Sequence, residues 1–267
     1  MTWTNPAAFR AAVSSGAFTA PTAGICPGYA QANLIILARE VAADFAAFAR
    51  LNPRPCPVLE ETPAGVHHSS YLAKGDDILT SIPRYRIYRH GVYSEEVVDA
   101  TEFWQEDMVS FLIGCSFSFE EALLKAGLPV RHMEMGCNVP MYRSSLVTVP
   151  YGIFSGPVVV SMRPMLPEQA RKAAEITSRF PGVHGAPLHI GDPAEIGITD
   201  LDKPDYGDPV KFNPGEVAVF WACGVTPQAA VTQAKPALAI SHAPGHMLVT
   251  DILNSDLEGW LPDGGAS

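Results

Sequence analysis

Apolar positions recur every three or four residues in some stretches of the chain and form short unbroken runs in others. The first pattern is typical of helices that bury one face, and the second of buried strands. Expected helices cover residues 5–15, 30–50, 102–112, 118–127 and 167–180, and another opens at Thr226-Pro227. Asn5 before Pro6 caps the first helix, and Ser118 with Glu121 is typical of a capping box at the fourth.

Expected strands are shorter and lie between these helices. They cover residues 58–59, 85–88, 91–98, 158–162, 188–190, 217–222, 237–240 and 247–250, with 85–88 and 91–98 forming a hairpin. This alternation favours an α/β fold: a layered mixed sheet with flanking helices plus a smaller α+β subdomain. We expect residues 1–129 and 198–267 to form the main α/β domain and residues 130–197 a smaller β-α-β subdomain. The sequence shows no internal repeat.

Composition narrows the class of protein. Of 267 residues, 47% are hydrophobic and only 17% are charged, which excludes an intrinsically disordered chain. The formal net charge of −10 argues against nucleic acid and anionic membrane surfaces as partners. The longest strongly apolar stretch, residues 217–225, is too short to span a bilayer.

The cysteines and the N-terminus predict the compartment. Five cysteines are an odd number without C-x-x-C spacing, which is typical of free thiols in a reducing environment. The N-terminus lacks a basic segment followed by an apolar one, so no signal peptide is expected. The sequence predicts a soluble cytoplasmic protein, and we expect a homo-oligomer because so many apolar residues must be covered.

Polar residues follow apolar runs in three segments, residues 114–118, 221–228 and 241–246. In open α/β sheets ligands bind beyond the carboxyl ends of strands, so these segments are candidates for one shared site. The first two lead into helix N-termini, whose free N–H groups suit a carboxylate. They predict a small acidic substrate. The alternative is that Ser118 and Thr226 only cap their helices.

Charged and nucleophilic residues near these segments each allow two interpretations. Arg163, at the end of an expected strand, and Arg131 suit a carboxylate clamp, and the alternative is a surface salt bridge. Glu120 is an acid–base candidate if it is buried, and otherwise it stabilises the helix dipole. Cys223 and Cys115 are either nucleophiles or small core residues.

The His242-x-x-x-His246 spacing raises the question of a metal. With Asp251 as a third ligand these histidines would form a metal site, whereas Pro244-Gly245 between them favours a hydrogen-bonded turn. Acid–base use of one histidine is a third interpretation. Because the chain has neither a G-x-G-x-x-G fingerprint nor a G-x-x-x-x-G-K-[ST] loop, we expect no nucleotide cofactor, and no metal or other cofactor either.

Six segments of the chain resemble one protein family. They are Phe111–Ala122, Asn138–Tyr142, Val160–Pro164, Gly185–Asp192, Phe220–Gln228 and His242–His246. Together they resemble the hydro-lyase family that shares its domain with the mitochondrial D-glutamate cyclase, over about residues 27–251. The resemblance implies a lyase that eliminates water from a small carboxylic or amino acid, as in conversion of D-glutamate to 5-oxo-D-proline. It implies no redox or nucleotide cofactor.

Such a cyclisation suggests roles for the candidate residues. The carboxylate must be held, the amine deprotonated, the oxyanion stabilised and the leaving hydroxide protonated. Glu120 and His242 are expected to exchange protons, and Cys223 and His246 are further catalytic candidates. Expected substrate-binding residues are Arg163, Arg131, Ser116, Ser118, Asn138, Thr226 and Gln228.

Three alternatives to this reaction stay open. One is a different hydro-lyase that abstracts a proton next to a carboxylate. Another is a non-catalytic small-acid-binding protein, which would keep its ligand after Glu120→Gln or His242→Asn. The third is a metal-dependent hydro-lyase or hydrolase that uses His242 and His246, with Asp251 as a third ligand.

Overall fold

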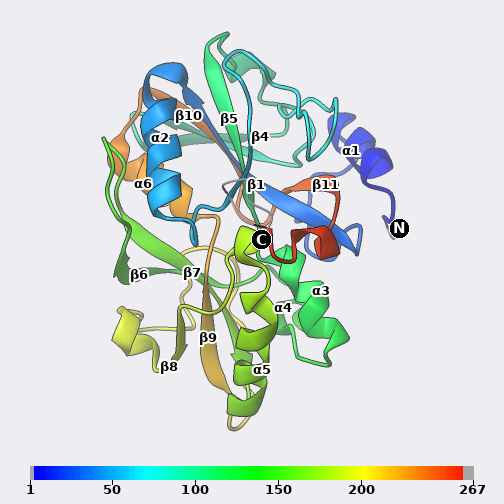
Figure 1. Cartoon of the computed structure of the whole chain (residues 1–267), viewed down its shortest axis with the longest axis vertical. Helices are drawn as coiled ribbons and strands as arrows, with labels where there is room; N and C mark the ends of the chain where they lie inside the picture. Colours follow the sequence, from blue (N-terminus) through cyan, green and yellow to red (C-terminus); the bar gives the residue numbers. More distant parts are fainter. Residues whose placement is uncertain (1–2, 261–267) are drawn as a thin grey trace.

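Two sheets, one in each half of the molecule, form the framework of the fold (Figure 1). The computed structural model describes residues 3–260. The larger sheet has seven strands in the order β2-β5-β1-β10-β3-β4, with β11 also paired to β1, and the smaller sheet has the order β6-β7-β9-β8. Within the described range the strand pairs are antiparallel and six α-helices flank them. The α/β class is confirmed.

The elements have the following bounds. The larger sheet contains β1 (Tyr29–Ala38), β2 (Val58–Glu61), β3 (Tyr85–Arg89), β4 (Val92–Val97), β5 (Met108–Gly114), β10 (Leu238–His242) and β11 (Leu248–Leu253). The smaller sheet contains β6 (Met141–Val147), β7 (Pro157–Met165), β8 (His189–Gly191) and β9 (Val217–Ala222). The helices are α1 (Pro6–Ser14), α2 (Arg39–Leu51), α3 (Phe117–Lys125), α4 (Arg131–Met135), α5 (Pro167–Ser178) and α6 (Thr226–Ala234).

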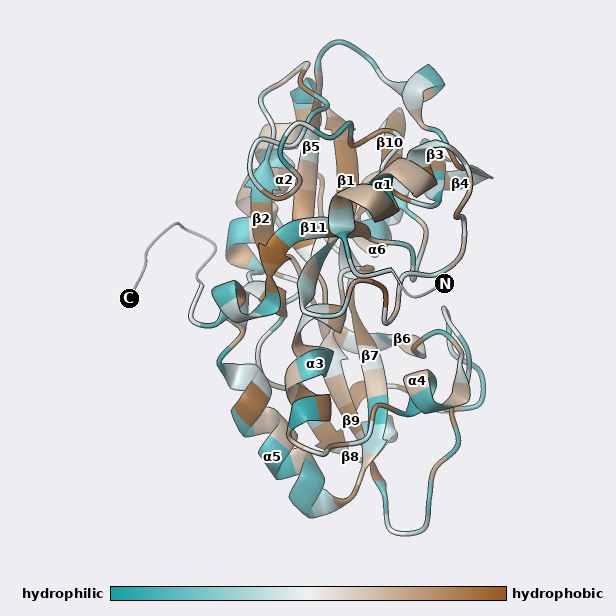
Figure 2. Cartoon of the chain, turned by 90° about the vertical axis from the view of Figure 1, so that its right-hand side faces the viewer, coloured by the Kyte–Doolittle hydropathy of each residue, from teal (hydrophilic) through white to brown (hydrophobic). Residues whose placement is uncertain are grey.

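The inner strands β1, β5 and β10 of the larger sheet are buried on both faces. Along β1, Leu34 and Ile36 pack into one core cluster with residues of α3 and α5, whereas Ile35 and Leu37 pack into another with residues of α2 and α6. Figure 2 shows β1 and β5 as neighbouring apolar strands. In the second cluster Phe45 of α2 meets Phe111 of β5 with ring centroids 4.8 Å apart.

This double burial overturns two predicted helices. The first half of the helix expected over residues 30–50 is strand β1, and only its second half is a helix, α2. The helix expected over residues 102–112 is a short 3₁₀ turn, Thr101–Phe103, followed by strand β5. Where a central strand is buried on both faces, almost every position is apolar, so residues three and four apart are apolar without any helix.

The remaining predicted elements are confirmed, with small shifts at their ends. They are the first helix, the hairpin of β3 and β4, the helices α3, α5 and α6, and the strands β2, β7, β8, β9, β10 and β11. The predicted boundaries of the subdomain at residues 130 and 197 stay a prediction. The smaller sheet takes β6, β7 and β8 from that stretch and β9 from residues further along the chain.

One arrangement of elements occurs twice in the chain, although the sequence shows no repeat. The first unit is β1-α2-β2-β5-α3, with β3 and β4 inserted, and the second is β7-α5-β8-β9-α6. Their strands lie in corresponding order, β2-β5-β1 and β8-β9-β7. The next strand of each unit is exchanged, because β6 follows the first unit but pairs with β7, and β10 follows the second but pairs with β1. Each unit therefore completes the sheet of the other.

Corresponding hydroxyl groups fix the helices that follow β5 and β9. The Ser118 hydroxyl accepts a hydrogen bond from the backbone N–H of Gln31 at 3.0 Å, and the Thr226 hydroxyl accepts one from that of Val159 at 3.0 Å. Neither hydroxyl caps its own helix. The predicted capping box at Ser118 is therefore wrong, because a buried strand N–H takes the hydroxyl.

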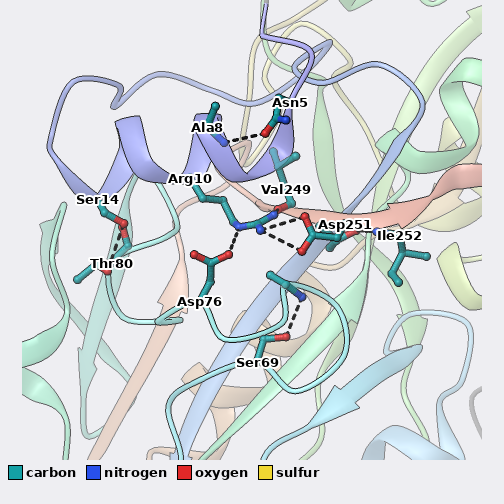
Figure 3. A network of polar contacts seen from close by, with 12 residues as sticks. Asn5, Ala8, Arg10, Ser14, Ser69, Asp76, Thr80, Val249, Asp251 and Ile252 are labelled. Atoms are coloured by element: carbon teal, nitrogen blue, oxygen red, sulfur yellow. Dashed lines mark hydrogen bonds and ion pairs between the residues drawn. The ribbon is translucent and has the colours of Figure 1, made fainter.

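A charged network holds α1 against the larger sheet (Figure 3). Arg10 of α1 is only 2% exposed and donates to the Asp76 carboxylate, to the carbonyl oxygen of Val249 at 2.9 Å and to the Asp251 carboxylate at 3.0 Å. Asp251, the third ligand of the metal alternative, is therefore part of an ion pair at the α1–β11 contact.

We predict that Ser118→Ala and Thr226→Val each lower the free energy of unfolding by about 1–3 kcal/mol, because each leaves a buried strand N–H without an acceptor. Urea unfolding measures the change. Ser178→Ala is the control, since its exposed hydroxyl bonds only to the Glu175 carbonyl of the same helix. Losses no larger than that of the control would contradict the proposed anchoring role.

Candidate functional site

The three polar segments expected from the sequence come together where the two sheets adjoin. One small cavity is lined by Cys115, Ser116, Cys223, Gly224, His242 and Gly245, which come from all three segments. Its volume of about 20 Å³ leaves room for about one water molecule. The expectation that a site lies beyond the carboxyl ends of strands led to this place although the sheets are antiparallel, because β5, β9 and β10 all end at this junction.

Close backbone contacts hold the junction together. A Cβ atom on Gly224 would lie 2.0 Å from Nδ2 of Asn33 in β1, and one on Gly245 would lie 2.5 Å from Nδ2 of Asn138. Asn33 itself donates to the Gly114 carbonyl oxygen at 2.8 Å. A side chain at either turn would displace an asparagine amide, and Gly245 also has a φ of 86°, which favours glycine. Asn33 thus ties β1 to the end of β5 and packs against the turn after β9.

Arg163 of β7 is a fully buried charge at this junction. Its guanidinium lies against the rings of both Phe119 and Trp221, with the Cζ atom 5.3 Å from each ring centroid. It donates to the Glu120 carboxylate at 2.9 Å through Nε, and to the hydroxyls of Ser116 and Ser161 at 3.1 Å each. The fork is thus occupied by protein groups, and Glu120 is its counter-ion.

Glu120 of α3 is 3% exposed and lies between two cationic or basic groups. Burial alone would raise its pKa, but the charges and hydrogen bonds of His132 and Arg163 outweigh this and lower the pKa to about 2. A carboxylate with this pKa is ionised at neutral pH. Glu120 therefore offers the site a fixed negative charge.

His132 of α4 is the functional candidate that sequence reasoning missed. It is fully buried, its Nε2 lies 3.3 Å from the Glu120 carboxylate, and its Nδ1 has no hydrogen-bond partner. Its ring stacks on Phe117 with centroids 5.9 Å apart. No motif in the sequence around His132 marks it, because its place in the site depends on contacts with Phe117 and Glu120 of α3.

Two larger pockets adjoin the small cavity. The first, of about 390 Å³, is lined by His132, Met133, Cys137, Asn138 and Asp208 among others. The second, of about 80 Å³, shares Met133 with the first and Phe117 with the small cavity, and Glu120, Gln31 and Asn254 also line it. Buried side-chain oxygens of Asn138, Gln31 and Asn254 have no hydrogen-bond partner. Unpartnered acceptors therefore lie on residues that line these pockets.

His242 and Gln228 form a buried pair beside the small cavity. Nδ1 of His242 accepts from the Leu34 N–H at 3.1 Å, and Gln228 donates to the His242 carbonyl oxygen at 2.9 Å. Burial lowers the pKa of His242 to about 4, so its imidazole is neutral at pH 7. His246 is half-buried with Nδ1 3.1 Å from the Pro244 carbonyl oxygen, and burial lowers its pKa too.

Other predicted site residues are engaged away from the pockets or have protonated thiols. Arg131 donates to Glu216 at 2.6 Å and to Glu134 at 2.9 Å. Burial raises the pKa of the Cys223 thiol to about 11 and that of Cys115 further, which leaves both thiols protonated at neutral pH. Between residues 3 and 260, His242, His246 and Asp251 do not form a cluster of metal-ligand atoms.

Comparison with known proteins identifies the family. Residues 109–251 match the family model described as D-glutamate cyclase. The chain belongs to the D-glutamate cyclase family. A protein named "Putative hydro-lyase" from Stutzerimonas stutzeri is 57% identical over 95% of this chain and 96% of its own length. Similarly named proteins from Bordetella petrii and Bacillus velezensis are each 55% identical, over 93% and 95% of this chain and 95% and 96% of theirs.

Family membership confirms the expected lyase class and the expectation of an enzyme. Among solved structures, a nitrogen repressor-like protein from Methanococcus jannaschii aligns over 89% of this chain and 92% of its own, with 10% identity and a TM-score of 0.39. So weak a likeness carries no functional information. No helix within residues 3–260 has the length and apolar character needed to cross a membrane.

We predict that the protein loses stability as the pH falls from 6.5 to 4.5. His184 and His242 are fully buried, and burial lowers the pKa of each from 6.5 to about 4. Both imidazoles stay neutral in the native state until the pH approaches 4, whereas in the unfolded state they take up protons below pH 6.5. Each histidine therefore costs about 2 kcal/mol over this interval.

Urea unfolding at four pH values between 4.5 and 7.5 measures this dependence. His184→Asn and His242→Asn should each reduce the slope between pH 6.5 and 4.5, and half-buried His246 accounts for part of the remainder. His90→Asn, at an exposed hairpin position, is the matched control and should leave the slope unchanged. A wild-type protein whose free energy of unfolding is flat over the interval would contradict the prediction.

Proposed function

We propose that the protein eliminates water from a small amino acid, with cyclisation of D-glutamate to 5-oxo-D-proline as the first candidate reaction. Family membership supports the reaction class, and the hydro-lyase names of the relatives support elimination of water. The observation that carries the proposal is the buried imidazole of His132 at a pocket wall, whose Nε2 faces ionised Glu120 and whose Nδ1 has no hydrogen-bond partner.

Cyclisation of glutamate is a transfer of protons within the substrate. The ammonium nitrogen loses two protons in turn as it attacks the side-chain carboxylate. A C–N bond forms, a C–O bond breaks, and the oxygen leaves as water after it gains both protons. One imidazole within reach of both atoms can accept each proton and return it. We assign this shuttle to His132.

Glu120 and Arg163 support the imidazole. The Glu120 carboxylate oxygen that lies 3.3 Å from His132 is the one that Arg163 also binds. A fixed carboxylate orients an imidazole and stabilises its protonated form, so we assign Glu120 a positioning role. Arg163 keeps Glu120 ionised from behind and has no exposed surface of its own.

The unpartnered acceptors favour an amino acid over an acid that lacks nitrogen. Asn138 offers a buried oxygen in the first pocket, and Gln31 and Asn254 offer buried oxygens in the second. An ammonium group supplies donors for such oxygens. We assign the substrate carboxylates to the first turn of α3, which Ser116 and Phe117 bring to the cavity walls, because a helix N-terminus suits an anion. His242, across the small cavity, is the alternative to His132 for returning a proton to the leaving oxygen.

Incubation with D-glutamate tests the reaction. We predict that the purified protein forms 5-oxoproline from D-glutamate and not from L-glutamate, measured by chromatography of 5-oxoproline against a blank without protein. Product from the D form alone would support the cyclase reaction. Absence of product from both forms would contradict this substrate and direct the search to other small amino acids.

Substitution of His132 tests the assigned shuttle. We predict that His132→Asn lowers kcat by about 10²–10⁴-fold, the range for loss of an acid–base group, while KM changes little. His90→Asn is the control and should keep wild-type kinetics. An active His132→Asn protein with unchanged kcat would remove His132 from the chemistry.

Glu120→Gln separates positioning from structure. The amide keeps an oxygen for Arg163 but removes the charge that favours a protonated base. We predict a lower kcat and a shift of the acidic limb of the kcat/KM profile to lower pH. A merely structural role would lower kcat/KM at every pH without moving the limb, and a thermal melt establishes that the variant is folded.

A further inference from the structure

A second set of chemically suited side chains lies outside the pockets described above. Between residues 3 and 260, His67, His68 and Asp77 form a group whose potential ligand atoms all lie within 4.8 Å of one another. Nδ1 of His67 is 2.9 Å from Oδ1 of Asp77, and the two imidazole rings have centroids 4.3 Å apart. None of the three lines the pockets around His132.

The backbone around these residues is tied together on both sides. His68 and Asp77 form an isolated antiparallel bridge, and the Ile78 N–H donates to the His67 carbonyl oxygen at 2.8 Å. The Ser69 N–H donates to the Asp76 carbonyl oxygen at 3.1 Å. The two chain segments that carry the three side chains are therefore held side by side without any ion.

The loop between the two segments is fixed by a buried carboxylate. Glu60 of β2 is 7% exposed and accepts from the backbone N–H groups of Ser70, Tyr71 and Leu72 and from the hydroxyls of Ser69 and Ser70. The side chain of the neighbouring Asp76 is engaged by Arg10 (Figure 3). These contacts hold the loop in place, while His67 and Asp77 bond to each other and His68 is exposed beside them.

We propose that His67, His68 and Asp77 bind one divalent transition-metal ion of the zinc type. Imidazole nitrogens and a carboxylate oxygen are ligands that zinc accepts at about 2.0–2.2 Å. Ligand atoms on a shared ion then lie about 3–4 Å apart, so small side-chain rotations from the present separations suffice. Water completes the coordination, because His68 is exposed and the other two are half-buried.

The surroundings match such an ion. Trp104 packs edge-on to the His67 ring with centroids 5.4 Å apart and so limits its rotation. The Leu79 N–H donates to Oδ1 of Asp77 at 2.9 Å, which orients the carboxylate. Such outer contacts fix the first ligands of metal sites in proteins. The ion would clamp the loop between β2 and β3 and take no part in the chemistry around His132.

Titration with Zn²⁺ tests the proposal. The full chain carrying Cys137→Ser is stripped of metal with a chelator and titrated by calorimetry. The substitution removes the one cysteine of the five that is not buried, whose thiol could otherwise bind Zn²⁺. We expect one ion per chain, a melting temperature that rises with Zn²⁺, and visible absorption bands on substitution with Co²⁺. His67→Ala, His68→Ala and Asp77→Asn should each weaken binding at least about tenfold.

Controls separate this site from general surface binding. His90→Asn removes an exposed histidine elsewhere and should leave the affinity unchanged. Asp77→Asn keeps an oxygen for the Leu79 N–H, and melts without metal establish that each variant is folded. The proposal would be overturned if the His67→Ala and His68→Ala proteins bound Zn²⁺ as tightly as the Cys137→Ser protein does. It would also be overturned if the Cys137→Ser protein bound no Zn²⁺. Activity toward D-glutamate does not enter the test.

Discussion

The buried guanidinium of Arg163 is the constraint on which the junction depends. A charge with no exposed surface must be neutralised. Arg163 lies in β7 of the smaller sheet, and its counter-ion Glu120 lies in α3, which follows β5 of the larger sheet. Removing one partner of such a pair costs about 3–5 kcal/mol, because the other is left charged in the interior. The pair therefore ties β7 to α3. It also places a permanent carboxylate against His132, so the electrostatics of the candidate site follow from a structural requirement.

The repeated arrangement explains why the site is at this place. Each unit ends a strand with a cysteine and a tight turn into a helix, Cys115 before α3 and Cys223 before α6, and both turns face the same small cavity. The two units carry different residues at corresponding points. Where Glu120 meets a buried arginine in one half, Gln228 meets the backbone of His242 in the other. One half therefore carries charge and the other neutral hydrogen bonds.

Sequence patterns predicted those elements whose ends or exposed faces carry polar residues. The strand over residues 217–222 was placed to the residue because a turn and Thr226-Pro227 follow it. By contrast, the pattern over β1 and β5 predicts helices wrongly, since strands buried on both faces lose the alternation that marks a strand. The three polar segments of the junction could be predicted because each directly follows an apolar run in the sequence. His132 was not, because its burial, its stacking on Phe117 and its contact with Glu120 arise only from packing between distant segments.

The exchanged strands have a consequence for how the chain folds. Although the molecule has one sheet in each half, no single cut of the chain separates two complete sheets. The first unit needs β10 from the end of the chain, and the second needs β6, which precedes it. Completion of the larger sheet brings Ile35 opposite Ser241, almost the whole chain away. Such distant pairing slows folding. It also couples the halves, so loss of either should propagate to the other in a single cooperative transition.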